Sequence, residues 1–137
     1  MKYYSTCYCG AIKINAYFPH SIEAYQARAC DCDFCAPRGL AYLSDANGTI
    51  SFSPQDQMSQ LKQGSGQATF WQCNHCKQIV AVTNSENGEA RGAVSKALFD
   101  NEFSLKPSIW VSPKHLAPKE KAERWSTVWS AVVCSNG

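Results

Sequence analysis

The sequence carries little net charge and has no long apolar run, and both absences exclude classes of function. Its 13 lysines and arginines nearly balance 11 acidic residues, which gives a formal net charge of +2. Surfaces that bind nucleic acid usually concentrate basic residues, so this balance predicts no nucleic-acid partner. No segment reaches the roughly 18 apolar residues that a membrane-spanning helix requires. We therefore expect neither nucleic acid nor a membrane as a partner.

Repeats and low-complexity tracts are also missing. The 137 residues, 45% of them hydrophobic, predict a single folded domain over residues 1–137. The N-terminal segment 1–7 has no apolar core of the kind found in signal peptides. We therefore expect a cytoplasmic chain with reduced cysteines rather than a disulfide-bonded secreted one. The sequence does not indicate an oligomeric state.

Cysteine, in contrast, is abundant: the chain has eight, and seven of them lie in three tight groups. Cysteines this close in sequence can converge on one metal ion, with Zn–S distances of roughly 2.3 Å. Two pairs supply the four sulfurs of a closed structural site, and the remaining triplet leaves one coordination position open. The pairs are Cys7 with Cys9 and Cys73 with Cys76, and the triplet is Cys30, Cys32 and Cys35.

The two pairs predict a structural zinc site. They are far apart in the sequence, so one zinc ion would join the N-terminal strand to the middle of the domain. A structural zinc contributes on the order of 10 kcal/mol in small domains. Gly10, directly after the first pair, supplies the permissive backbone that a metal-binding turn needs.

The triplet has two interpretations. In the first, zinc leaves its fourth position to an incoming thiolate, and three sulfur ligands suit the binding and delivery of a thiol better than the generation of hydroxide. Cys30, Cys32 and Cys35 are then catalytic as well as metal ligands. The alternative is a second structural site, with its fourth ligand taken from elsewhere in the chain: Asp31, Asp33, His75 or Cys134.

Short apolar segments predict a mainly β fold with one C-terminal helix. We expect hairpin turns at 45–48 and 84–88, where Asn and Gly residues tolerate positive φ. Apolar residues at three- and four-residue spacing predict a helix from about Pro118 to Val132. The expected strands are 12–18, 25–29, 40–43, 49–52, 67–72, 78–83, 89–94 and 108–111.

The order C-x-C-G, C-x-C-x2-C and C-x2-C resembles the glutathione-dependent formaldehyde-activating enzyme family of carbon–sulfur lyases, over about residues 7–111. The resemblance implies a β-tent of several small antiparallel sheets stapled by zinc. It also implies a structural zinc at the two cysteine pairs and a central zinc at the triplet. A three-thiolate site exposed to air can lose its metal and oxidise, so we expect the central zinc to be the labile one. The implied reaction adds a small thiol, glutathione or an analogue, to formaldehyde or another small aldehyde and gives an S-hydroxymethyl adduct. Further matches are Gly39, Gly64-Ser65 and Ile109-Trp110-Val111.

Two positions differ from the family pattern. Asp31 stands where many members have histidine, and its carboxylate adds negative charge beside the triplet. Lys77 replaces a glycine after the last pair, and we expect it to adopt left-handed backbone geometry at a cost of roughly 1 kcal/mol. Arg38 is a candidate for holding a substrate carboxylate, and Asp31 and Asp33 are candidate proton donors. The rival function is a non-catalytic zinc module that binds a protein partner or a small thiol.

Overall fold

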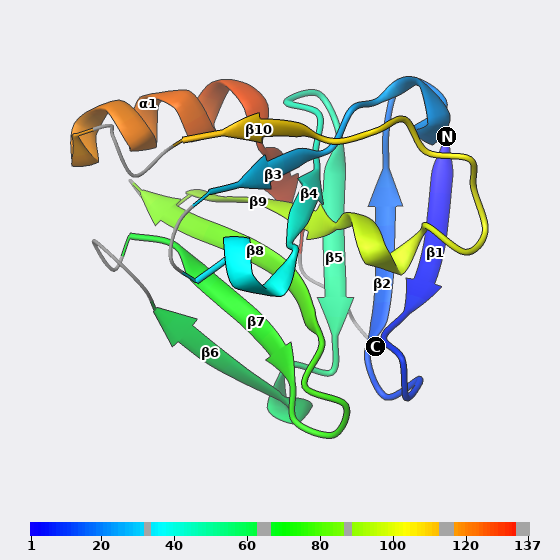
Figure 1. Ribbon diagram of the computed structural model, residues 1–137. Coiled ribbons are helices and arrows are strands. Elements are labelled where there is room, and N and C mark those ends of the chain that lie inside the picture. The colour runs from blue at the N-terminus through cyan, green and yellow to red at the C-terminus, as the bar shows by residue number, and fades with distance from the viewer. Residues whose placement is uncertain (32–33, 63–66, 87–88, 113–116, 134–137) are drawn as a thin grey trace.

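The computed structural model describes residues 1–31, 34–62, 67–86, 89–112 and 117–133. Within these ranges the fold is mainly β, as expected, with one short α-helix (Figure 1). Eleven strands are connected by pairing into one branched sheet, in which antiparallel neighbours predominate. Two pairs are parallel, β3 with β10 and β5 with β11, so the sheet is mixed rather than wholly antiparallel.

One arm of the sheet contains the N-terminal strands, which lie side by side in Figure 1. β1 pairs with β2, and β2 pairs with β5, both in antiparallel register. β11 then joins this arm to β9, because it pairs with β5 on one side and β9 on the other. The bounds are β1 Lys2–Thr6, β2 Lys13–Tyr17, β5 Thr49–Ser53 and β11 Ser130–Val132.

β9 is the strand at which the sheet divides. It pairs with β8, which continues through β7 to β6, and it also pairs with β4, which continues through β3 to β10. The bounds are β3 Arg28–Cys30, β4 Ala41–Leu43, β6 Met58–Lys62, β7 Thr69–Cys73, β8 Ile79–Glu86, β9 Glu89–Ser95 and β10 Ile109–Val111. Single-turn 3-10 helices are η1 Ile22–Ala24, η2 Ala36–Arg38, η3 Gln55–Gln57 and η4 Lys96–Leu98.

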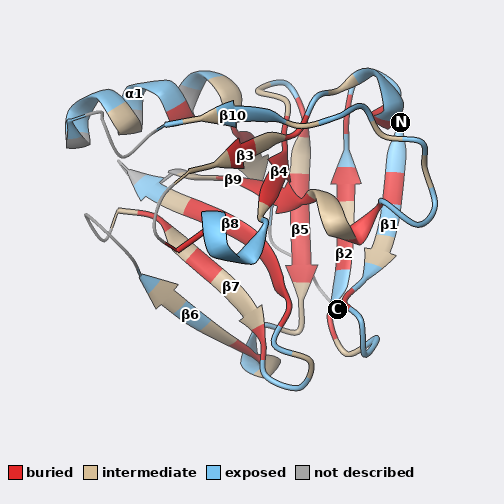
Figure 2. Cartoon of the chain, in the orientation of Figure 1, coloured by how far each residue is buried: buried red, intermediate tan, exposed pale blue. Residues whose placement is uncertain are grey.

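Two apolar clusters fill the space between these arms, and Figure 2 shows the buried residues concentrated in the middle of the strands. The larger cluster includes the fully buried Phe18, Ile50 and Phe99. The smaller one lies under α1 (Pro118–Val128), where the rings of Trp125 and Trp129 stack with their centroids 4.5 Å apart. Burial of these two tryptophans fixes the helix on the sheet.

The C-terminal helix is shorter than expected. It ends at Val128, and the residues from Ser130 to Val132 form β11 instead. The β-branched end of the segment suits a strand, and pairing with two neighbouring strands satisfies its backbone groups. The prediction of a helix as far as Val132 was therefore wrong over its last turn.

One of the two expected hairpins is present. β8 and β9 pair out to Glu86 and Glu89, which confirms the hairpin predicted around 84–88. The turn at 45–48 also forms, with the Gly48 N–H donating to the Asp45 carbonyl oxygen at 2.8 Å. However, β4 and β5 on either side of it pair with other strands, so the hairpin predicted there was wrong.

Candidate metal centre

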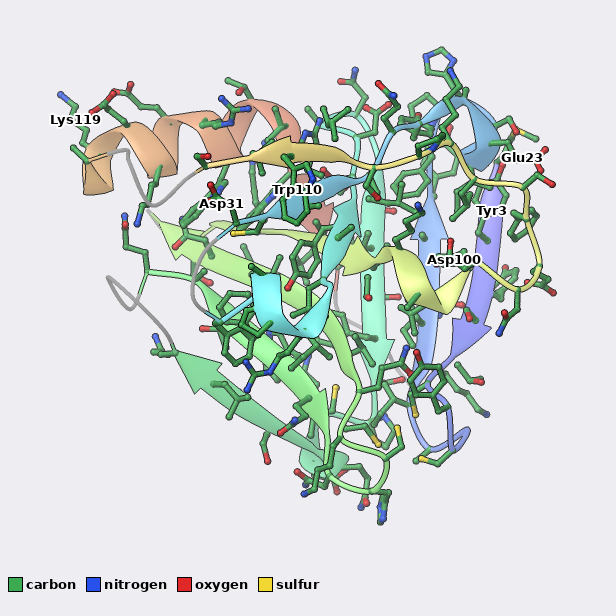
Figure 3. The ribbon with its side chains drawn as sticks, in the orientation of Figure 1. Tyr3, Glu23, Asp31, Asp100, Trp110 and Lys119 are labelled. Atoms are coloured by element: carbon green, nitrogen blue, oxygen red, sulfur yellow. The ribbon has the colours of Figure 1, made fainter. Side chains whose placement is uncertain are left out.

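Four sulfur atoms gather where the ends of β1 and β7 meet (Figure 3). The Sγ atoms of Cys7, Cys9, Cys73 and Cys76 all lie within 4.8 Å of one another. Two of these separations, Cys7 to Cys9 and Cys9 to Cys73, are 3.6 Å each. A tetrahedron with metal–sulfur bonds of roughly 2.3 Å has sulfur–sulfur edges of about 3.8 Å, so the donor set fits one tetrahedral metal ion such as zinc.

The first pair lies on a tight turn that follows β1. The Cys7 N–H donates to the Ile12 carbonyl oxygen at 3.1 Å, and the Gly10 N–H donates to the Cys7 carbonyl oxygen at 3.0 Å. The Ile12 N–H also points at the Cys7 sulfur, 3.4 Å away. Gly10 has φ of +80°, a left-handed conformation that side chains disfavour. The expected role of Gly10 in the turn is confirmed.

The second pair lies on the turn between β7 and β8. The Lys77 N–H donates to the Cys73 carbonyl oxygen, and the Cys73 N–H donates to the Gln78 carbonyl oxygen, both at 3.0 Å. Lys77 has φ of 65°, the one positive value recorded for a non-glycine residue within the described chain. This confirms the left-handed geometry expected for Lys77. Both cysteine pairs thus use a left-handed residue directly after the second cysteine.

The thiols of the cluster differ in acidity. The pKa of Cys76 is lowered to about 7: burial by itself raises it, but backbone N–H groups of Gln78 and Cys9 stabilise the thiolate. For Cys9, the backbone N–H of Ala11 lowers the pKa, yet partial desolvation and the neighbouring sulfurs raise it to about 11. Metal binding requires thiolates and therefore releases protons, so metal affinity at this site rises with pH.

A second layer of polar groups supports both turns, and sequence patterns did not reveal it. The Tyr8 N–H donates to Oε1 of Gln78 at 2.8 Å, which links the first turn to the second. Gln57 of η3 holds the second turn from the other side. Its carbonyl oxygen accepts from the Asn74 N–H at 2.9 Å, and its Oε1 lies 2.8 Å from Nε2 of His75. No sequence motif predicts the roles of Gln57 and Gln78, because their hydrogen-bond partners are distant in the sequence.

The two cysteines of the triplet that the structure describes lie in a different part of the fold. Cys30 ends β3 and is partly buried, whereas Cys35 is fully buried and precedes η2. Both belong to the smaller apolar cluster, and the Cys35 sulfur lies 3.6 Å from the Tyr42 hydroxyl oxygen. Cys32, Asp33 and Cys134 fall outside the described residues. Cys30 and Cys35 thus lie in a different apolar cluster from Cys7 and Cys73.

Three other candidates have defined surroundings. Asp31, labelled in Figure 3, follows β3, and its carboxylate accepts a hydrogen bond from the Ser112 hydroxyl. The exposed Arg38 guanidinium lies 4.0 Å above the Phe34 ring and donates to the Phe34 carbonyl oxygen at 2.8 Å. His75 is exposed and belongs to the turn of the four-cysteine cluster, not to the triplet.

Comparisons with known proteins support the fold. Models of known protein families and a search of curated proteins give no match to this chain. Among solved structures, the crystal structure of a Rhodobacter sphaeroides protein, a structural genomics target, is similar with a TM-score of 0.56. The two sequences are 24% identical, and the alignment covers 81% of this chain and 100% of the other. In the described part of the chain, no helix combines the length and apolar character needed to cross a membrane.

Proposed function

We propose that this chain is a zinc-dependent enzyme of the carbon–sulfur lyase type, which adds a small thiol to formaldehyde or another small aldehyde. The observation that supports this most strongly is the division of the cysteines between two apolar clusters. Cys7 and Cys73 are buried in the larger cluster, whereas Cys35 is buried in the smaller one. One set can therefore staple the fold while the other remains available for chemistry. The cysteine order shared with the formaldehyde-activating family supports the choice of reaction.

In this proposal one zinc ion is held by Cys7, Cys9, Cys73 and Cys76, and a second by Cys30, Cys32 and Cys35. Zinc at the triplet would favour the thiolate form of a bound thiol at neutral pH. Addition forms a carbon–sulfur bond, breaks the carbonyl π bond and moves the thiol proton to the former carbonyl oxygen. The product is a hemithioacetal, and the reverse reaction regenerates thiol and aldehyde.

The residues around the triplet have two tasks in this reaction. Arg38 carries five N–H donors, of which one bond to Phe34 uses one, and the others are suited to a substrate carboxylate. Stacking on the Phe34 ring fixes the orientation of the guanidinium, and Phe34 directly precedes Cys35 in the sequence. The carboxylate of Asp31, adjacent to Cys30, adds negative charge and opposes acidic groups on the thiol. The Arg38 guanidinium can offset this repulsion by pairing with a carboxylate, so we propose a thiol that carries one, glutathione or an analogue.

NMR exchange between free glutathione and its formaldehyde adduct tests this function. We expect zinc-replete protein to accelerate the exchange, and Cys32→Ser to abolish the acceleration while the protein stays folded. Cys134→Ser, a matched substitution outside the three groups, should exchange as fast as the wild type. If zinc-replete wild-type protein gives no acceleration, or Cys32→Ser keeps it in full, the proposed reaction is wrong.

A second candidate is a non-catalytic zinc module that binds a protein partner. It is favoured by Trp110 and Ile109, which are 69% and 43% exposed on β10, the last strand of its arm. Such a module would hold a fourth protein ligand at the triplet and show no affinity for glutathione. Titration of glutathione into zinc-replete protein by calorimetry separates the two candidates, because only the proposed enzyme has to bind glutathione.

A further inference from the structure

We propose that Gln78 is a positioning residue that aligns the two cysteine turns for metal binding. The inference depends on metal binding by the four-cysteine cluster and is independent of the reaction proposed for the triplet. Gln78 directly follows Lys77, so it leaves the second turn as β8 begins. Its side chain reaches back to the first turn, which lies 70 residues earlier in the chain.

Two hydrogen bonds connect Gln78 to the cysteine turns. Its Oε1 accepts from the Tyr8 N–H at 2.8 Å, and its carbonyl oxygen accepts from the Cys73 N–H at 3.0 Å. Tyr8 is the residue between Cys7 and Cys9, so a bond to its amide constrains both sulfurs of that pair. Gln78 therefore connects the two turns that carry the four sulfurs.

Burial gives these contacts their strength. Gln78 is only 8% exposed, and a buried amide group that lacks hydrogen-bond partners destabilises the folded state. Among the described residues, its Nε2 has no hydrogen-bond partner. Of the two polar atoms of this buried amide, only Oε1 is hydrogen-bonded, and its partner is the Tyr8 N–H. A glutamine at this place is explained by the alignment of the turns better than by packing, because an apolar side chain would fill the site without that cost.

Alignment of the turns lowers the cost of binding metal. If the two turns moved independently, their four thiols would lose conformational freedom when a metal ion ordered them. Turns that are already fixed relative to each other lose less freedom, so metal binding is stronger. Groups that support metal ligands without touching the metal typically change metal affinity by 10–100-fold when they are removed. We expect an effect of that size from loss of the Gln78 oxygen.

Gln78→Met is the direct test, because methionine has similar length but no amide oxygen. The side chain lines a groove of about 700 Å³ together with Cys7 and Tyr8, so there is room for the larger sulfur atom. Zinc affinity is measured by competition with a chromophoric chelator, and the geometry is followed by the visible spectrum of Co²⁺-loaded protein. We expect about 10–100-fold weaker zinc binding and a Co²⁺ spectrum altered from that of the wild type.

Two further variants complete the experiment. Gln78→Glu keeps a side-chain oxygen for the Tyr8 N–H, and we expect its zinc affinity to stay closer to wild type than that of Gln78→Met. Gln60→Met makes the matched change on the exposed face of β6 and should bind zinc as the wild type does. Wild-type affinity and an unchanged Co²⁺ spectrum in Gln78→Met would overturn the proposal. If Gln78→Met fails to fold, a tenfold or greater loss in Gln78→Glu would overturn it instead.

Discussion

The sulfur atoms of Cys9 and Cys73 lie 3.6 Å apart, although 64 residues separate them in the chain. Cys9 follows β1 at the end of one arm of the sheet, and Cys73 ends β7 in the other arm. A metal ion between them would close a long loop and tie these two arms of the sheet together. Because a closed loop restricts the unfolded chain, such a link stabilises the folded state.

Removal of this metal is the first prediction. We expect a chelator to lower the thermal unfolding midpoint of zinc-loaded protein by more than about 10 °C, because a structural zinc contributes several kcal/mol. Differential scanning calorimetry measures the shift, which added zinc should reverse. Cys73→Ser should unfold at the midpoint of metal-free protein and should show no change when chelator is added. Cys134→Ser should show the same chelator-induced decrease as the wild type. Equal midpoints with and without chelator would show that the cluster is not a staple.

Lys77 gives a second prediction, on stability. Its left-handed backbone, at φ of 65°, costs a non-glycine residue about 1–2 kcal/mol. Glycine removes that cost but adds about 0.5–1 kcal/mol of freedom to the unfolded chain. We expect Lys77→Gly to stabilise the zinc-loaded protein by about 0.5–1 kcal/mol in urea denaturation. Lys77→Ala keeps a Cβ and should change little, so a gain from alanine as large as that from glycine would contradict this explanation.

Tyr25 and Asp45 give a prediction with a pH dependence. The Tyr25 hydroxyl donates to Oδ2 of Asp45 at 2.6 Å, which lowers the pKa of Asp45. Burial, followed by this bond, raises the pKa of Tyr25 to about 12. The stabilisation from Asp45 is therefore present above its unfolded pKa of about 3.9 and lost below it, and that from Tyr25 is lost as pH rises from about 10 to about 12.

The matching experiment compares Tyr25→Phe with the wild type by urea denaturation at several pH values. We expect Tyr25→Phe to be less stable by about 1 kcal/mol at pH 7, since both partners are only partly buried. The difference should shrink as pH falls below about 4, where Asp45 becomes protonated. Tyr17→Phe, on the exposed side of β2, is the control and should match the wild type throughout. A difference that does not change with pH would mean that the lost contact is not this hydrogen bond.

Gly92 gives a prediction about the branch point of the sheet. It pairs with β8 and with β11, and a Cβ added there would lie 2.5 Å from the Val82 carbonyl oxygen. The clash is with backbone, which cannot move without disturbing the pairing. We expect Gly92→Ala to cost about 1–3 kcal/mol in urea denaturation. Ser85→Ala, an exposed change on β8, should stay within about 0.5 kcal/mol of wild type, and a Gly92→Ala value in that range would contradict the steric argument.

Local patterns were sufficient to predict the four-cysteine cluster and most strands. The close spacing of Cys73 and Cys76 predicts a tight turn, and the glycine that Lys77 replaces in the family pattern indicated a left-handed residue there. These are properties of a few consecutive residues. Alternation of apolar residues likewise located β2, and the Asn and Gly residues at 84–88 located the β8–β9 hairpin.

Contacts between distant segments were beyond the reach of such patterns. The turn at Asp45 is held by Ser130, whose hydroxyl accepts from the Asp45 N–H at 2.9 Å and donates to its carbonyl oxygen at 2.7 Å. Ser130 begins β11, and β11 pairs with β5. The helix therefore stops before Ser130, and β5 pairs with β11 rather than with β4 across the turn at 45–48. The link from Gln78 to Tyr8 is equally non-local. Each is decided by how the chain packs as a whole, so no short window of sequence contains the signal.

The assignment of the seven clustered cysteines to two separate zinc sites is tested most directly by native mass spectrometry of protein purified with zinc under reducing conditions. We expect two zinc ions in the wild type and one in the Cys32→Ser variant, whose four-cysteine cluster is intact. A wild type that holds a single zinc ion, and a Cys32→Ser variant that holds the same one, would contradict the second site and with it the proposed chemistry at the triplet.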